Sequence, residues 1–133
     1  MKVLVDTSIW SLALRRKHVS VESKNLTDLI LTSQLVMIGP VRQELLSGIS
    51  DKGTFSRLKL KLEPFEDMAI TTKDYETAAQ YFNICRSRGV QGSHIDFLIC
   101  TVAANNNLLI YTSDQDFGHF AKYLPIRLYD CHG

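Results

Sequence analysis

The sequence predicts an α/β fold, a three-layer α/β/α sandwich in which helices cover both faces of a central, mostly parallel sheet. Short runs of valine, leucine and isoleucine alternate along the chain with longer segments whose apolar residues recur at helical spacing. The runs are apolar throughout, which is typical of strands buried on both faces of a parallel sheet. The length of 133 residues suffices for one hydrophobic core, so residues 1–133 are predicted to form a single domain.

The N-terminal third alternates strands and helices clearly. Its strands are predicted from continuous apolar runs, and its helices from apolar residues three and four positions apart. Pro40 suits the first turn of a helix, and Gly48 is of the residue type most common just after a helix ends. The predicted elements are strands at 2–6 and 35–38 and helices at 8 to about 16, 21–33 and 40–48.

The middle of the chain allows two interpretations. Residues 57–62 alternate basic and apolar residues, which favours a strand, but a short helix leading into a strand near 65–70 is equally consistent. Beyond it, Tyr75, Ala78, Ala79 and Phe82 define one helix face, and Ser93 begins another helix. The elements predicted there are helices at 72–89, 93–105 and 114–123 and strands at 108–111 and 126–129.

Composition narrows the class of protein. The hydrophobic share of 45% and the charged share of 22% are typical of a globular protein, and no apolar stretch approaches the roughly 20 residues of a membrane span. Asp6 interrupts the only run that resembles a signal peptide, so we expect a cytoplasmic protein. The odd, scattered cysteines, Cys85, Cys100 and Cys131, cannot supply a structural zinc site, and the first two are predicted core residues.

Acidic residues recur where parallel strands end. Asp6 ends the first predicted strand, and Asp114 follows the strand at 108–111. Glu44 and Asp96 lie near the starts of helices, which in a parallel sheet begin at that same edge. Crowded carboxylates repel one another, and a divalent cation such as Mg²⁺ relieves this repulsion with oxygen ligands. One ion, or two ions in the arrangement used for phosphodiester cleavage, would fit four such acids.

Each of these acids also has a structural explanation. Asp6, Thr7 and Ser8 are turn and helix-capping residue types, and Asp96 follows Ser93 at the spacing of a capping box. Asp114 is a possible helix cap and Glu44 a possible exposed helix residue. The structural explanation requires four independent coincidences at one sheet edge, so the metal-site interpretation is preferred.

The motifs that contain these acids resemble the PIN domain, and most closely the VapC-type toxin ribonucleases of toxin–antitoxin pairs. The resemblance lies in V-D-T-S-I-W at the start of the chain, V-R-Q-E-L around Glu44, H-I-D-F-L-I around Asp96, and T-S-D-Q-D-F around Asp114. It implies catalytic roles and metal binding for Asp6, Glu44, Asp96 and Asp114. It also implies a further acidic metal ligand at Asp116 and supporting hydroxyls at Thr7 and Ser8.

The same resemblance implies an activity and partners. Members of that group cut RNA with Mg²⁺ or Mn²⁺, commonly form homodimers, and are silenced by a cognate VapB-like antitoxin. With the five acids set aside, nine acidic residues face fifteen basic ones. This excess of basic residues suits a phosphate-attracting surface, to which residues 15–18 and the basic residues of 57–61 would contribute. Each of these two groups could equally be an ordinary solvated surface.

Other interpretations stay open. The protein could be a non-catalytic PIN-like module that binds RNA or protein. A phosphohydrolase of the haloacid-dehalogenase type is disfavoured because it needs a second aspartate where this chain has Ser8. His94 and His119 lie near motif acids as potential RNA contacts or proton shuttles, with His119 favoured, but such histidines are more often bystanders. Arg86 and Arg88 either line an RNA groove or end a helix, and Trp10 is expected in the core or a dimer interface.

Overall fold

Parallel strands form one sheet in the order β2-β1-β3-β4 within residues 1–15 and 20–130, the part of the chain that this computed structural model describes. Val3 pairs with Leu35 on one side and with Leu109 on the other, so β1 is central. The strands are β1 (Val3–Val5), β2 (Leu35–Val36), β3 (Leu109–Tyr111) and β4 (Arg127–Leu128). The all-parallel sheet confirms the predicted fold class.

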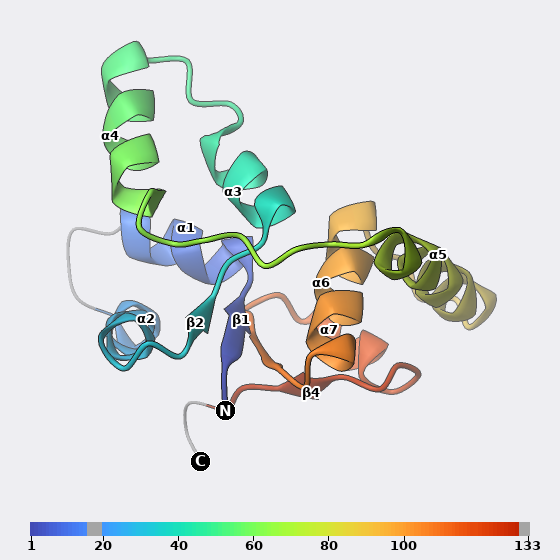
Figure 1. Ribbon diagram of the computed structural model, residues 1–133. Coiled ribbons are helices and arrows are strands. Elements are labelled where there is room, and N and C mark those ends of the chain that lie inside the picture. The colour runs from blue at the N-terminus through green and yellow to red at the C-terminus, as the bar shows by residue number, and fades with distance from the viewer. Residues whose placement is uncertain (16–19, 131–133) are drawn as a thin grey trace.

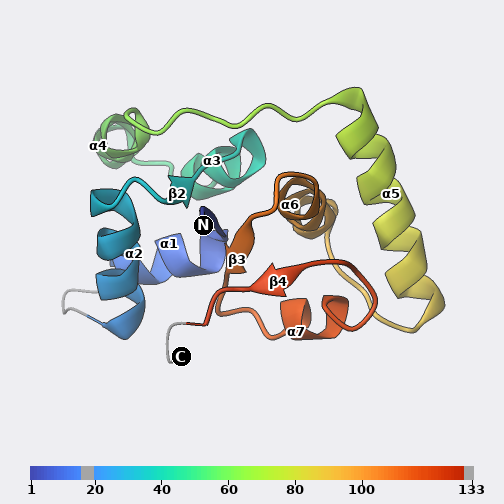
Figure 2. The ribbon, with the colours of Figure 1, turned by 60° about the horizontal axis from the view of Figure 1, so that its bottom comes forward.

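Helices cover both faces of this sheet (Figures 1 and 2). Helices α1 and α2 lie on one side, α6 lies on the other, and α5 packs outside α6. Helices α3 and α4 stand beyond the carboxyl ends of the strands (Figure 1). The helices are α1 (Thr7–Arg15), α2 (Val21–Leu31), α3 (Gly39–Leu46), α4 (Lys52–Leu62), α5 (Thr72–Ser87), α6 (His94–Asn105) and α7 (Asp116–Phe120). None of the described helices is long and apolar enough to cross a membrane.

Local sequence signals set the ends of these helices. Ser20, Thr71 and Ser93 are N-caps, and each forms a capping box in which cap and third helical residue bond reciprocally. Gly48 and Gly89 follow α3 and α5 with positive φ angles of 85° and 77°, a conformation that glycine adopts without a steric penalty. The predicted helix ends are therefore confirmed to within a few residues.

The core lies between the sheet and its two helical layers. Leu4, Ile99 and Ile110 have no exposed surface. Cys85 and Cys100 are also fully buried, as free thiols, which confirms their predicted core role. Trp10 is 4% exposed and packs edge-on against Phe65 with ring centroids 5.5 Å apart, so its expected core position is confirmed.

The strand interpretation of residues 57–62 is wrong, because this segment is the C-terminal half of α4. Leu58 and Leu62, four residues apart, face the core, whereas Leu60 between them is 65% exposed. The alternating pattern therefore reflects a narrow apolar side of a helix rather than the two faces of a strand. The alternative interpretation is closer, since α4 leads into an extended segment in which Asp67 forms a parallel bridge with Met37.

The predicted apolar face of α5 is only partly buried. Ala78 packs inward together with Asp74 and Cys85, but Tyr75 is 54% exposed and Ala79 is exposed as well. Residues 16–19 and 131–133 are outside the described residues. They include most of the predicted basic group at residues 15–18, and they include Cys131.

Candidate functional site

Three of the predicted acids lie at the carboxyl edge of the sheet. Asp6 follows β1 directly, and Asp114 lies in the loop between β3 and α7. Asp96 lies in the first turn of α6, which begins at this edge and runs antiparallel to the strands (Figure 1). The topology predicted from sequence therefore brings these three acids to one end of the molecule.

Asp6 is held in place by hydroxyl groups. It is 5% exposed, and its Oδ2 accepts hydrogen bonds from Ser8 Oγ and from Thr112 Oγ1, both at 2.8 Å. Its backbone N–H donates to the carbonyl of Tyr111 at 2.9 Å, which continues the β1–β3 pairing. Both side-chain bonds use the same carboxylate oxygen, so Oδ1 takes part in neither of them. A buried carboxylate needs such donors, because its charge is otherwise poorly solvated.

The same hydroxyls connect the loop after β1 to the loop after β3. Ser8 Oγ accepts from the N–H of Ser113 at 3.0 Å, and Thr112 Oγ1 accepts from the N–H of Asp114 at 3.0 Å. Asp114 Oδ1 in turn accepts from the N–H of Asp116 at 2.9 Å. Asp114 therefore bonds to the first residue of α7, although the N-cap of that helix is Gln115, and the position of Asp114 is fixed relative to Asp6.

Thr112 is a site residue that sequence reasoning did not identify. Its hydroxyl bonds to both Asp6 and Asp114, so it sets the relation between two predicted metal ligands. The available signal was a threonine directly after a buried strand and two residues before an aspartate, inside the T-S-D-Q-D-F motif. Ser8, predicted as a supporting hydroxyl, bonds to Asp6 Oδ2 and to the loop of Ser113.

Asp96 caps its helix, which is one of the two roles that the sequence left as alternatives. Its Oδ2 accepts from the N–H of Ser93 at 2.9 Å, and its own N–H donates to Ser93 Oγ at 3.1 Å, which completes the capping box. The pKa of Asp96 is raised, first by burial and further by the negative charges of Asp6 and Asp114. The three carboxylates are thus close enough to interact electrostatically while Asp96 caps its helix.

Two predicted acids and one hydroxyl behave differently. Glu44 is exposed on α3, and Asp116 is the exposed first residue of α7. Neither is among the groups that shift the pKa of Asp96 in the described part of the chain. The hydroxyl of Thr7 is buried, and within the described residues it has no hydrogen-bond partner.

Glu44 instead lines a groove of about 440 Å³ between α1, α3 and α4. The groove has apolar and basic walls, formed in part by Leu14, Leu45, Arg57 and Lys61. Arg57 and Lys61 belong to the basic stretch that the sequence identified as a potential phosphate-attracting surface.

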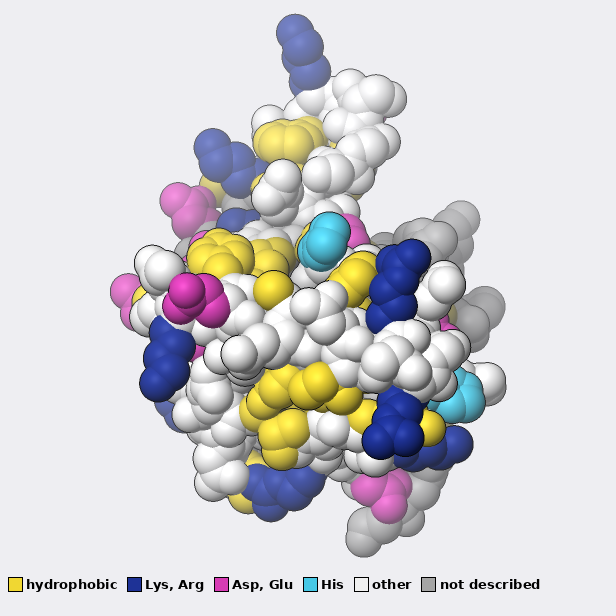
Figure 3. Space-filling view, turned by 90° about the vertical axis from the view of Figure 1, so that its right-hand side faces the viewer, with side chains coloured by type: hydrophobic (Ala, Val, Ile, Leu, Met, Phe, Trp, Pro, Cys, Tyr) yellow, Lys and Arg dark blue, Asp and Glu magenta, His cyan; other side chains and the backbone are white. Residues whose placement is uncertain are grey.

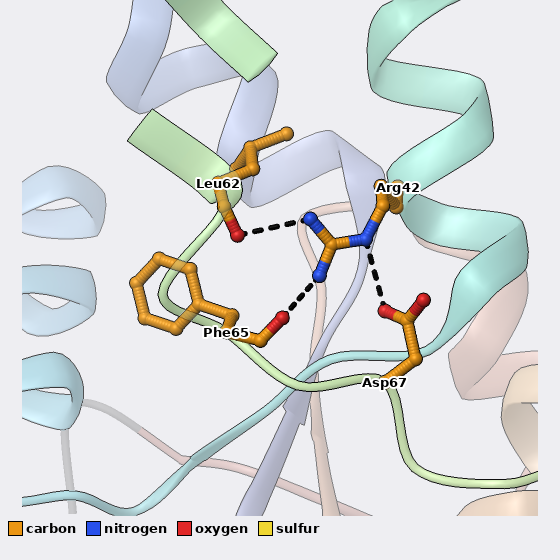
Figure 4. Close-up of polar contacts among 4 residues, drawn as sticks. All are labelled: Arg42, Leu62, Phe65 and Asp67. Atoms are coloured by element: carbon orange, nitrogen blue, oxygen red, sulfur yellow. Dashed lines mark hydrogen bonds and ion pairs between the residues drawn. The ribbon is translucent and has the colours of Figure 1, made fainter. Parts of the chain in front are cut away.

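Arg42 links α3 to the end of α4. Its Nε donates to Asp67 Oδ1 at 3.0 Å and its Nη1 to the carbonyl of Leu62 at 2.9 Å, while its Nη2 donates to the carbonyl of Phe65 (Figure 4). Leu62 is the last residue of α4, so the guanidinium also lies where the helix dipole favours positive charge. One side chain of α3 therefore holds the end of α4 and the segment that follows it.

The donor set has the chemistry of a site for a hard cation. Asp6, Asp96, Asp114 and their hydroxyl partners offer only oxygen atoms, and the mutual repulsion that raises the pKa of Asp96 would be relieved by a divalent cation. Among the described residues, no three histidine, cysteine or acidic side chains converge closely enough to hold an ion as they stand. Mg²⁺ nevertheless fits, because it retains several waters and commonly takes only one or two carboxylates directly.

Comparison with protein families identifies the domain. Residues 3–123 match the family model of the PIN domain. The chain belongs to the PIN domain family. The matched range contains all the predicted site residues, from Asp6 to Asp116. No individually curated protein matches the sequence.

Solved structures share the fold of this PIN domain at low sequence identity. FitAcB from Neisseria gonorrhoeae matches with a TM-score of 0.78 and 18% identity, covering 98% of each chain. DNA-bound VapBC from Salmonella typhimurium matches with a TM-score of 0.79 and 15% identity, also over 98% of each chain. VapBC2 from Rickettsia felis, bound to a promoter DNA fragment, matches with a TM-score of 0.76 and 21% identity, covering 97% of this chain and 98% of the other.

Proposed function

We propose that this PIN domain is a metal-dependent endoribonuclease and the toxin of a toxin–antitoxin pair. The observation that best supports the activity is the interacting group of Asp6, Asp96 and Asp114 at the carboxyl edge of the sheet, where open parallel sheets bind their ligands. Membership of the PIN family and the oxygen-only donor set support a nuclease that uses Mg²⁺ or Mn²⁺.

The chain's residues have distinct roles in this proposal. Asp6 and Asp114 would hold the cation, and Asp96 would contribute while capping α6. Glu44 and Asp116 would complete the site from its exposed side. A bound divalent cation supplies Lewis acidity, which makes water a better nucleophile and offsets charge on the phosphate oxygens.

Ser8 and Thr112 would act as positioning residues rather than ligands. Their hydroxyls bond to Asp6 Oδ2, which fixes the carboxylate plane and leaves Oδ1 outside both bonds. Thr7, next in sequence to Asp6, would support that residue from within the structure, because its hydroxyl is buried and has no partner in the described part of the chain.

The partner proposal rests on the structural neighbours. Their names describe VapBC and FitAB complexes, and two of the three cited structures contain DNA. We infer a VapB-like antitoxin for this chain, and the groove lined by Glu44 is the surface on which a bound segment would cover the site. We also infer a homodimer, which light scattering of the purified chain would detect.

One observation favours the second candidate, a PIN-like module that binds RNA or protein without cutting. Within the described residues the acids do not converge into a ready three-ligand site. The two functions differ in whether metal binding and RNA cleavage occur, so one set of experiments separates them.

The test is incubation of the purified chain, free of partner, with structured RNAs in Mg²⁺ or in EDTA. The wild type should cut only in Mg²⁺, and Asp6→Asn should remain folded but lose cleavage. Asp28→Asn, at an exposed aspartate of α2, is the matched control and should cut normally. Folded protein that neither raises its melting temperature in Mg²⁺ nor cuts any RNA would support the non-catalytic module instead.

A further inference from the structure

A row of aromatic rings leads from the core to the surface beside the acidic site. Ring centroids lie 5.2 Å apart between Phe117 and Phe120 and 4.9 Å apart between Phe120 and Phe97. The row continues from Phe97 to Phe82 at 5.6 Å and from Phe82 to His94 at 5.3 Å. The last contact is a stack, with ring planes only 19° apart. The row therefore joins α7, α6 and α5 and ends at His94.

Burial decreases steadily along this row. Phe117 and Phe120 have no exposed surface and Phe97 has 1%, whereas Phe82 is half-buried and His94 is exposed. The inner rings are immobilised by core packing, so they restrain the orientation of the outer two. His94 thus presents an imidazole that is held flat against Phe82 and is also accessible to solvent.

The surroundings of His94 suit a flat, anionic polymer. His94 is the first residue of α6, two positions before Asp96, so both residues belong to the first turn of that helix. It borders a hollow of about 240 Å³ whose lining includes Tyr75 and Leu98. The guanidinium of Arg86, one turn after Phe82 on α5, lies 5.8 Å from the Phe82 ring centroid and adds positive charge.

We propose that His94, supported by Phe82, is a stacking platform for a nucleobase of single-stranded RNA, with Arg86 beside it for the RNA backbone. Bases stack on aromatic side chains irrespective of sequence, and arginine contributes both charge and a planar surface. This proposal rests on the proposed function, because it names how the substrate is held next to the carboxylates. His94 is a substrate-contacting residue in this proposal and takes no part in bond cleavage.

RNA fits this face better than a second copy of the chain. A stable interface between two proteins buries about 800 Å² on each partner around an apolar centre. On the face that carries α5, hydrophobic side chains form several separate groups divided by polar and basic ones, with histidine side chains among them (Figure 3). Such mixed aromatic and basic surface is typical of a nucleic-acid contact.

The test measures RNA binding without cleavage. Fluorescence anisotropy of a labelled 12-nucleotide single-stranded RNA in EDTA would compare the wild type with His94→Ala, His94→Trp and Leu31→Ala. His94→Ala should bind about ten-fold more weakly, from the loss of one base stack. His94→Trp should restore affinity, and Leu31→Ala, at a strongly exposed apolar residue of α2, should match the wild type. An RNA of the same length with abasic sites should bind the wild type and His94→Ala equally.

The possible outcomes separate the platform from the nuclease. The platform would be overturned if His94→Ala bound RNA with wild-type affinity, or if His94→Trp bound RNA as weakly as His94→Ala. Metal-dependent cleavage would still support the nuclease in either case. A base-dependent loss of binding in His94→Ala would support the platform even if no RNA were cut. A loss that persists on abasic RNA, or a dimer that dissociates in His94→Ala with unchanged RNA affinity, would also overturn it. Absence of any RNA binding would overturn both proposals.

Discussion

Replacing Arg42 with methionine should open the connection between α3 and α4. Methionine retains an apolar stem but donates no hydrogen bonds, so the carbonyls of Leu62 and Phe65 and the carboxylate of Asp67 all lose their partner. These three acceptors hold the end of α4 and the segment after it against α3. The variant therefore tests whether one side chain maintains the connection between α3 and α4.

The expected cost is about 3 kcal/mol. The ion pair is partly exposed, with side chains 23% and 41% accessible, so it contributes less than about 1 kcal/mol. Each part-buried bond from the charged guanidinium to a carbonyl contributes about 1.5 kcal/mol, at the lower end for charged donors because water reaches the site. For a domain of this size the total corresponds to a fall in melting temperature of about 12 °C.

Urea denaturation of four proteins would check this reasoning. Arg42→Met should lower the free energy of unfolding by about 3 kcal/mol. Arg42→Lys should recover at most about a third of that, because an ammonium lacks the planar fork that reaches three acceptors. Asp67→Asn should cost less than about 1 kcal/mol. If Asp67→Asn proves as damaging as Arg42→Met, the ion pair rather than the carbonyl bonds holds α4 against α3, and the reasoning fails.

Three further predictions concern separate parts of the molecule. In thermal melts in EDTA, Asp96→Asn should be at least as stable as the wild type, because asparagine keeps a capping oxygen and removes the repulsion between carboxylates. Mg²⁺ at ten times its Kd should raise the stability of the wild type by about 1.4 kcal/mol. The same Mg²⁺ should leave the stability of the variant unchanged. Asp74→Asn should cost about 1–2 kcal/mol at pH 7 by urea titration. Gly92→Ala should cost about 1–3 kcal/mol, because a Cβ there would lie 2.5 Å from Phe120 Cζ.

The Asp74 prediction has a defined pH dependence. Hydrogen bonds from the Thr71 backbone, and also from the Asn105 and Thr71 side chains, lower the pKa of Asp74 in the folded state. A lowered pKa stabilises the fold above the unfolded value of about 3.9, and this stabilisation disappears as the pH falls through the folded value. The difference in the free energy of unfolding between wild type and Asp74→Asn should therefore be largest at pH 7 and shrink below about pH 4. A gap that widens on acidification would contradict this assignment.

Much of the fold could be predicted because local and global signals agree. The buried strands are continuous apolar runs, and Gly48 and Gly89 lie where only a positive φ continues the chain. The approach of Asp6, Asp96 and Asp114 followed from one rule, that parallel strands end and their helices begin at a common edge. Glu44 shows the limit of this rule, because an exposed residue one turn into a helix is not positioned by strand topology alone.

The remaining features depend on distant contacts that no local pattern encodes. The alternation in α4 suited a strand as well as a helix, and only packing of Leu58 and Leu62 against the core decides between them. Thr112 acquires its role from Asp6, and His94 from Phe82 on the preceding helix. Neither pair is close in sequence, so their significance emerges only when the layers are assembled.

The hydroxyl bridge between the loops after β1 and β3 has a consequence for synthesis of the chain. Thr112, which orients Asp6, is made 106 residues after it. A nascent chain that has not yet reached β3 lacks both Thr112 and Asp114, even if its earlier helices have already formed. Domains fold as units during translation, so the acidic site is completed only after β3 and the loop that follows it have been made. A cell would thus be protected from incomplete products of a nuclease of this design.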